Sequence, residues 1–363
     1  MKPYRPQQLP LSGLHWKPLI RLIGPANAAL ARFDGVLQTM INPELLLSPL
    51  RTQEAVLSSR IEGTQATLRE VLEFEATREE KPEKAQDIQE IINYRTALQT
   101  AVESLDDRPI SLNMIKQIHS ILLDTVRGRD RARGLFRTQQ NWIGRPGSPI
   151  EQASYVPPPP LGLMAHLDNL EKYVHHDEVD RLVQLAIVHA QFELIHPFLD
   201  GNGRVGRILI PLFLYEKKLL SSPMFYLSAY LEANRDAYYD RLQGISDHGD
   251  WEGWIQFFLT AIIEQAKANS DKAKAVLDLY DEMKQEISRA TRSQFAIQAL
   301  DALFHMPVFT RANFIRHSGI PKTSADRVLH ALINKRHVAR IRDGGGQRPI
   351  IFRFGKLLKL LEN

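Results

Sequence analysis

Hydrophobic residues recur at helical spacing along most of the chain. Between residues 51 and 76 they fall three or four positions apart, and Gly63 breaks the pattern. The stretches DIQEIINYRTALQTAVESL and SLNMIKQIHSILLDTVRG each combine an apolar and a polar helical face, and DEVDRLVQLAIVHAQFELI extends the helical pattern to residue 195. Residues 1 to about 50 are punctuated by proline instead, so the first helix is expected near Pro49. The pattern predicts a mainly α fold.

Two segments interrupt the helical pattern. GLFRTQQNWIGRPGSPIEQASYVPPPP (134–160) has aromatic and β-favouring residues followed by Gly and Pro turn signals, which predict a short β-hairpin. After a long charged helix, from about 264 to 290, three further helical stretches precede ARIRDGGGQRPIIFRF, which suggests two short strands around a Gly-rich turn. We therefore expect an N-terminal region (1–88), a helical core with its trailing helix (89–290) and a C-terminal domain (291–363).

Composition narrows the chemistry. The 363 residues include no cysteine, which excludes disulfides, thiolate nucleophiles and Cys-ligated metals. The sequence starts without the apolar core of a secretory signal, and no uncharged apolar run approaches the roughly 18 residues of a membrane span. A soluble, cytoplasmic protein without membrane contact is expected.

The twelve residues HPFLDGNGRVGR (196–207) place several reactive groups close together. Pro197 cannot continue the preceding helix, so the chain should leave the core at His196, whose imidazole can accept a proton from a hydroxyl. Asp200 supplies the hard oxygen ligand that Mg²⁺ prefers when phosphates share its coordination shell. These groups suggest proton transfer and metal binding within one short segment.

The second half of this segment suits anion binding. Gly201-Asn202-Gly203 can present consecutive backbone N–H groups to an anion without obstruction by Cβ atoms. The following helix, RVGRILIPLFLYE, offers an N-terminus that attracts negative charge. Arg204 and Arg207 lie three residues apart, on one side of that helix, and suit two phosphates of a polyphosphate. The whole segment predicts phosphate-centred transfer to a hydroxyl.

HPFLDGNGRVGR matches the Fic motif, HPFx[D/E]GNGRxxR, at every specified position, and the sequence resembles the Fic family over roughly residues 90–265. IHSILLDTVRG, GLFRTQQNWIG and SAYLEANRDAYYDRL contribute to the resemblance. It implies a Fic helical core with a β-hairpin flap, in which His196 is the general base and Asp200 holds Mg²⁺. It also implies AMP transfer from ATP to a Ser, Thr or Tyr hydroxyl of target proteins and of the chain itself. The nucleotide-binding residues that it implies are Gly201, Asn202, Gly203, Arg204, Val205, Gly206, Arg207, Tyr238 and Tyr239.

The same resemblance assigns a role to the predicted hairpin. In the family this hairpin is a flap that aligns the backbone of the target protein by strand addition. The residues of this chain that would dock a target are Thr138, Trp142, Ile143 and Gly144.

SSRIEG (58–63) resembles the inhibitory motif of the family, [S/T]xxxE[G/N], and it precedes the core. Ser58 and Glu62 are four residues apart, so a helix would place both on one face. The resemblance implies that Glu62 pairs with Arg207 and denies this arginine to the γ-phosphate of ATP. Members inhibited in this way can also remove AMP, with the same glutamate orienting a water molecule.

The net charge of +4 is unevenly distributed. From residue 293 onward, 12 Lys and Arg face four Asp and Glu, so this segment carries +8 and the rest of the chain −4. Helix–turn–helix plus hairpin resembles a winged helix, which predicts either DNA binding through residues 293–363 or a packing and protein-contact role. The basic residues of its predicted recognition helix and wing are Lys322, Arg327, Lys335, Arg336, Arg340, Arg342 and Arg348.

The sequence thus predicts a protein adenylyltransferase that is restrained by Glu62 and that can also remove AMP. One alternative is a Fic-type transferase of another group, phosphoryl or phosphocholine. The other is a DNA-binding regulator with an inactive Fic core, against which the intact His196 and Asp200 argue. The target protein and the oligomeric state stay open, with a homodimer among the candidates.

Overall fold

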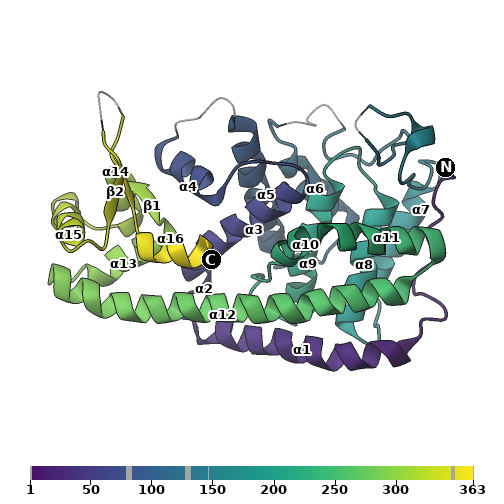
Figure 1. Ribbon diagram of the computed structural model, residues 1–363, viewed down its shortest axis with the longest axis horizontal. Coiled ribbons are helices and arrows are strands. Elements are labelled where there is room, and N and C mark those ends of the chain that lie inside the picture. The colour runs from purple at the N-terminus through teal and green to yellow at the C-terminus, as the bar shows by residue number, and fades with distance from the viewer. Residues whose placement is uncertain (1, 79–83, 127–131, 146, 345–347, 363) are drawn as a thin grey trace. The chain divides into compact units, whose positions relative to one another are not determined.

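The computed structural model describes residues 2–78, 84–126, 132–145, 147–344 and 348–362. They fall into two compact units. Unit 1 lies within residues 1–34, 57–63 and 93–267, and unit 2 within residues 35–56, 64–92 and 268–363. Helices dominate both units, so the predicted mainly α fold is confirmed (Figure 1). The region boundaries expected after residues 88 and 290 stay predictions.

The secondary-structure elements follow one another in a nearly all-helical order (Figure 1). They are α1 (Trp16–Thr39), α2 (Pro43–Leu46), α3 (Ser48–Ile61), α4 (Leu68–Thr77), α5 (Ala85–Leu105), α6 (Leu112–Leu122), the 3₁₀ helix η1 (Ile150–Gln152), α7 (Leu163–Val174), α8 (Arg181–Ile195), α9 (Asn202–Glu216), α10 (Ser228–Ala233), α11 (Arg235–His248), α12 (Trp251–Thr291), α13 (Ala296–His305), β1 (Val308–Thr310), α14 (Arg311–Ser318), α15 (Lys322–Asn334), β2 (Ala339–Arg342), β3 (Ile351–Arg353) and α16 (Gly355–Glu362).

Helices α8 and α9 form the centre of unit 1, where they pack against each other. Asp180 caps α8 by accepting hydrogen bonds from the backbone N–H groups of Leu182 and Val183. From Leu182 to Ile195, every residue of α8 except Glu193 is buried, as its long apolar run requires. Apolar side chains on α6 and α7 cover this pair. A rigid helix therefore precedes the HPFLDGNGRVGR segment.

The turn between α8 and α9 has a constrained backbone. α8 ends at His196, whose φ of 49° lies in the left-handed region, and Pro197 cannot continue the helix. Gly201 (φ 79°) also has a left-handed conformation, which a glycine adopts without strain, and α9 begins at the next residue. The predicted exit from the helix at His196 is confirmed.

The predicted hairpin in residues 134–160 is present as a single antiparallel bridge rather than as paired strands. Ile143 donates its N–H to the carbonyl of Tyr155 at 2.8 Å and accepts from the N–H of Ser154 at 2.8 Å. η1 and the run of prolines from residue 157 leave few backbone donors to continue a ladder. Residue 146, within the expected turn, lies outside the described residues.

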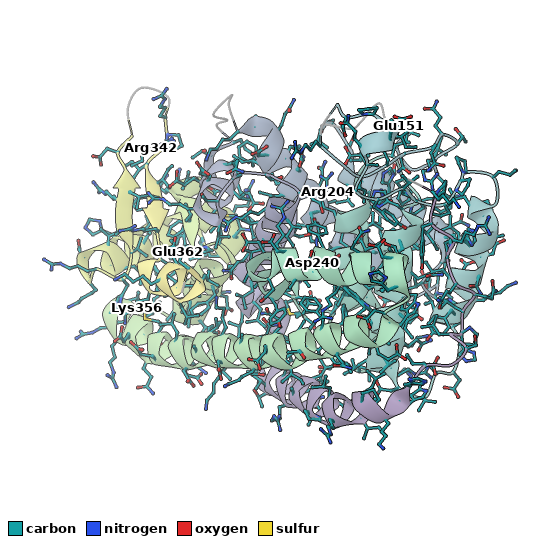
Figure 2. All side chains as sticks on the ribbon, turned by 45° about the vertical axis from the view of Figure 1, so that its right-hand side comes forward. Glu151, Arg204, Asp240, Arg342, Lys356 and Glu362 are labelled. Atoms are coloured by element: carbon teal, nitrogen blue, oxygen red, sulfur yellow. The ribbon has the colours of Figure 1, made fainter. Side chains whose placement is uncertain are left out.

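The C-terminal module, residues 296–362 of unit 2, contains helices α13–α16 and a three-stranded antiparallel sheet in the order β1-β3-β2. The three helices and two strands predicted for the tail are confirmed, and β1 and α16 are additions that the sequence pattern did not indicate. Phe309 and Phe352 stack across the sheet with ring centroids 5.8 Å apart. Lys356 on α16, labelled in Figure 2, forms ion pairs with Glu282 at 2.7 Å and Glu286 at 3.2 Å on α12.

Two helices differ from the sequence-based expectation. α1 forms in the proline-punctuated start of the chain, because Pro18 lies in its first turn and Pro25 is tolerated within it. The helix expected from about residue 264 is continuous with the preceding core segment, so α12 runs from Trp251 to Thr291. Among the described residues, no helix is long and apolar enough to cross a membrane.

Candidate active site

Hydrogen bonds between a side chain and the backbone hold the segment between α8 and α9 in a loop. The amide oxygen of Asn202 accepts from the N–H of Phe198 at 2.8 Å, and its amide nitrogen donates to the carbonyl of Phe198 at 2.9 Å. Phe198 itself is fully buried. These contacts fix the backbone around Gly201 and Gly203. The N–H groups at the N-terminus of α9 are therefore positioned to bind an anion.

His196 has one defined ring tautomer. Its Nδ1 lies 3.2 Å from the carbonyl oxygen of Glu193, and since a carbonyl only accepts, Nδ1 carries the proton. Burial lowers the pKa of His196 to about 4, against the opposing effects of that carbonyl and of the charges on Glu62 and Asp200. The ring is therefore neutral at neutral pH, with the lone pair on Nε2. This is the form that a general base requires.

A second histidine, His119 on α6, packs against the loop between α8 and α9. Its ring stacks on Phe198 with centroids 3.7 Å apart. Nδ1 accepts from the N–H of Gly134 at 2.9 Å, so Nε2 donates to the carbonyl of Asp200 at 3.0 Å. The sequence pattern does not indicate this role, because one histidine in an amphipathic helix gives no signal of its distant partners.

Arg137 connects the flap to the same loop. Its guanidinium donates to the carbonyls of His196 at 2.9 Å and Pro158 at 2.5 Å, and its backbone N–H donates to the carbonyl of Pro197 at 2.9 Å. Burial lowers the pKa of Arg137 to about 10, which still leaves it charged at neutral pH. The flap and the loop after α8 are thus joined by a buried cation, another residue that the motif alone did not reveal.

Arg204 and Asp200 are neighbours one helical turn apart. A guanidinium nitrogen of Arg204 lies 3.4 Å from a carboxylate oxygen of Asp200, with the arginine almost fully buried and the aspartate 37 % exposed. Within the described residues, no group of three or more His, Asp or Glu side chains could hold a metal ion. A single accessible carboxylate nevertheless fits Mg²⁺, which commonly takes one or two protein carboxylates and completes its shell with phosphates and water.

Arg207 is held by the end of α3. Its Nε donates to Ser58 Oγ at 2.8 Å, and one Nη donates to the Ser58 carbonyl at 3.0 Å and to Glu62 at 2.7 Å. The helix stops at Ile61, so Glu62 lies just beyond it and still reaches the arginine that the inhibitory motif implies. Arg207 is 1 % exposed, whereas the Glu62 side chain keeps 33 % exposure. The pair is accessible from the glutamate side.

The two charges of this pair stabilise each other. Burial acts to raise the pKa of Glu62, but the charge and hydrogen bond of Arg207, with smaller effects of Arg204 and His196, hold it below its ordinary value. Burial acts to lower the pKa of Arg207, and Glu62 more than offsets this, so it lies above the ordinary value. Both groups are fully ionised at neutral pH.

A cavity of about 700 Å³ opens beside these groups, lined by residues of unit 1 that include Glu62, Glu193, His196, Gly203 and Arg207. Its size suits a nucleotide. The loop after α8 forms one part of the wall, and α11, which carries Asp240 (Figure 2), forms another. The sequence-predicted base, anion-binding backbone and one of the two arginines thus meet at one cavity.

The two predicted tyrosines differ in their surroundings. Tyr238 is 1 % exposed, and its hydroxyl donates to Nε2 of His189 at 3.0 Å, since Nδ1 of that histidine faces the Gly206 carbonyl. Tyr239 is 42 % exposed, lines the cavity and has the Arg235 guanidinium 5.8 Å from its ring centroid. Both rings line the cavity, but Tyr239 is the more exposed one, on which a base could stack, whereas Tyr238 is almost fully buried.

The predicted flap residues lie at the surface. Thr138, Trp142, Ile143 and Gly144 are exposed, and Ile143 also lines the cavity. Trp142 donates its Nε1–H to the Ser148 carbonyl at 3.0 Å. Gly201, which caps the N-terminus of α9, and Val205 and Gly206 within α9 are buried.

Sequence comparison identifies the family. Residues 20–103 match the Fic/DOC family N-terminal region, and residues 109–214 match the Fic/DOC family domain. The two segments together span more than half of the chain, which belongs to the Fic/DOC family.

Relatives and solved structures agree with this assignment. A probable protein adenylyltransferase of Aquifex aeolicus is 37% identical over 86 residues, 23% of this chain and 27% of the relative. The protein adenylyltransferase Fic of Aedes aegypti is 27% identical over 177 residues, 47% of this chain and 29% of the relative. The chain thus spans less than a third of the length of these relatives.

The similarity to solved structures concerns the fold. A Fic family protein from Desulfovibrio desulfuricans G20 is 19% identical and superposes with a TM-score of 0.57 over 97% of this chain and 98% of its own. Fic-1 from Caenorhabditis elegans is 20% identical, with a TM-score of 0.53 over 71% of this chain and 74% of that one.

Proposed function

We propose that the chain is a protein adenylyltransferase that transfers AMP from ATP to a Ser, Thr or Tyr hydroxyl. One observation carries the proposal: the Fic motif folds into a closed loop that brings His196, Gly203 and Arg207 to one nucleotide-sized cavity. The two relatives described above, which are named as adenylyltransferases, point in the same direction.

In this reaction Nε2 of His196 accepts the proton of the target hydroxyl. The hydroxyl oxygen then forms a bond to the α-phosphorus of ATP, and pyrophosphate leaves. The N-terminal backbone of α9, from Gly201 to Gly203, binds the α-phosphate, and Arg204 and Arg207 bind the distal phosphates. The low pKa of His196 keeps its base form available throughout the physiological pH range.

Mg²⁺ is the metal that the site would hold, with Asp200 as its protein ligand. The Asp200 carboxylate is the accessible partner of Arg204, so it can turn toward a metal ion that also binds the phosphates. When bound, the metal would neutralise charge that develops on the phosphates.

We also propose that the flap docks the target backbone. In an extended chain, the backbone N–H and C=O groups of neighbouring residues point to opposite edges of the strand. Those of Ile143 face Tyr155, so those of Trp142 and Gly144 face the other edge, where a target segment would pair.

Glu62 restrains the reaction by charge competition. The carboxylate occupies Arg207, and the γ-phosphate of ATP requires the same guanidinium. Because Glu62 is a third exposed, it can leave Arg207 without disturbing the buried core. The same carboxylate beside His196 would suit the orientation of a water molecule for AMP removal.

Intact-mass spectrometry after incubation with ATP and Mg²⁺ tests this function. We expect Glu62→Gly to gain AMP, the parent to gain much less, and Glu62→Gly combined with His196→Ala to gain none. A mass increase that corresponds to phosphate alone would identify the alternative of phosphoryl transfer. No mass change in any variant, with or without candidate targets, would reject transferase activity on the chain itself.

A second candidate function is DNA binding by the C-terminal module, whose element order suits a winged helix. Lys322, Arg327, Lys335 and Arg336, on and just after α15, are exposed together with Arg340 and Arg348 of the wing. Arg342 is the last residue of β2 (Figure 2). The arrangement would place α15 in a major groove.

A further inference from the structure

Glu193 is a carboxyl group in the nucleotide cavity that the proposed reaction does not use. It lies on α8, three residues before His196, and its side chain lines the same cavity as Arg207. Its Oε1 is buried and has no hydrogen-bond partner among the described residues. A buried carboxyl oxygen without a partner is costly to ionise, so its presence in the cavity calls for an explanation.

The position of Glu193 is fixed by the first turns of α9. A Cβ atom added at Gly206 would collide with Glu193 Oε1 and lie 3.2 Å from its Cδ. Glycine at position 206 therefore creates the space into which the carboxyl group fits. The titratable and charged groups that interact with the Glu193 carboxyl are Glu62 after α3, Arg207 on α9, and Tyr238 and Tyr239 on α11. His196, just after α8, contacts the backbone carbonyl of Glu193.

Electrostatics favour the neutral acid. Burial raises the pKa of Glu193 to about 8, Arg207 acts in the opposite direction, and the negative charge of Glu62 adds to the increase. Arg207 does not hold Glu193 ionised, because its Nε and one Nη are engaged by Ser58 and Glu62 and Glu193 Oε1 has no hydrogen-bond partner among the described residues. At neutral pH Glu62 is thus ionised, whereas Glu193 is protonated.

We propose that Glu193 is a further nucleotide-binding residue. Its neutral carboxyl group binds the nucleotide, and its ionised carboxylate weakens nucleotide binding. This inference rests on the proposed nucleotide site. The protonated acid can donate a hydrogen bond to a phosphate or ribose oxygen, whereas the carboxylate can only accept. An ionised Glu193 would also place a second negative charge beside Arg207, in competition with the γ-phosphate.

Nucleotide binding should therefore be coupled to a proton. A bound polyphosphate raises the pKa of a neighbouring carboxyl group, so at alkaline pH the nucleotide binds together with one proton. The linkage gives a dissociation constant that increases up to about tenfold per pH unit above the pKa of the free protein. Removal of Glu62 takes away one of the charges that raise this pKa, so in that variant the transition shifts toward neutral pH.

Calorimetry with α,β-methylene ATP and Mg²⁺ tests the proposal, because AMP transfer cannot break the methylene bridge of this probe. Glu62→Gly is compared with Glu62→Gly combined with Glu193→Gln, which keeps the shape of the side chain without a titratable proton. Between about pH 7 and pH 9 we expect the first variant to lose affinity and to take up close to one proton. The second should show a much smaller loss of affinity and little proton uptake.

Equal pH slopes and equal proton uptake in the two variants would overturn the inference alone. Absence of any nucleotide binding by Glu62→Gly would overturn the proposed function together with it. If Glu193→Gln does not fold, the proton uptake of Glu62→Gly on nucleotide binding, measured in buffers of different ionisation enthalpy, tests the role of Glu193. A value near zero across the same pH range would contradict the role of Glu193.

Discussion

The nucleotide cavity and the C-terminal module both rely on arginine, but they use it in opposite ways. Arg207 is 1 % exposed and has fixed partners in Ser58 and Glu62. The basic residues on and just after α15, such as Arg327 and Lys335, are exposed. A buried cation needs an anionic partner, either the glutamate or a phosphate that replaces it, whereas an exposed cation interacts weakly and is screened by salt. A single substitution should thus change the first region strongly and the second only in part.

The largest effect is expected inside the cavity, at His196. His196→Ala removes the proton acceptor, so AMP transfer by the Glu62→Gly variant should fall by about 10²–10⁴. ATP affinity should change little, because this residue handles the proton of the target and not the phosphates. Transfer of radiolabelled AMP and calorimetric ATP binding measure the two effects separately. Activity within a few-fold of the histidine-containing variant would show that another group is the base.

A smaller effect should follow from Gly206→Ala, which tests how closely the cavity wall is packed. The new methyl group would meet the carboxyl of Glu193 and lie 3.3 Å from the buried ring of Phe192. Overpacking of this kind typically lowers the free energy of unfolding by about 1–3 kcal/mol. Gly35→Ala is the matched control, because the helical Gly35 has nothing within 4 Å of its added Cβ. Chemical denaturation should separate the two, and equal stabilities would contradict the described packing.

The smallest effects are expected on the exposed face of the C-terminal module. If this face binds duplex DNA, Arg327→Ala and Lys335→Ala should each weaken binding a few-fold at low salt. Each should also reduce the salt dependence by about one released counterion. Lys17→Ala, which removes an exposed lysine from α1, serves as the control. Fluorescence anisotropy over a salt series makes the measurement. If all three variants behaved like the parent, this face would have a packing or protein-contact role.

The local part of the site could be predicted from the sequence, and its tertiary part could not. Within HPFLDGNGRVGR, Pro197 and Gly201 determine where one helix ends and the next begins, so adjacent residues carry their own geometry. His119, Arg137 and Glu193 come from other segments or show no local pattern, and only folding brings them to the loop. The inhibitory pair spans 145 positions and was predicted only because its motif resembled that of a known family.

The flap and α1 show a different limit of the sequence pattern. Turn signals near Gly144 indicated a hairpin, but the pattern did not predict how few backbone groups would pair. Proline suggested an irregular chain before residue 50, yet α1 tolerates Pro25 because the surrounding apolar residues, including Leu30 and Phe33, are buried. In both segments tertiary packing outweighed local propensity.

The ATP affinities of Glu62→Gly, Arg207→Ala and the double variant test whether Glu62 and the γ-phosphate compete for Arg207. A charge-assisted hydrogen bond is worth roughly 1.5–3 kcal/mol, so Glu62→Gly should bind ATP about one to two orders of magnitude more tightly than the parent. Arg207→Ala should bind weakly, and adding Glu62→Gly to it should restore little affinity, because the phosphate ligand is then missing. If the double variant bound ATP and transferred AMP as well as Glu62→Gly alone, Arg207 would hold neither the phosphate nor the inhibitory glutamate.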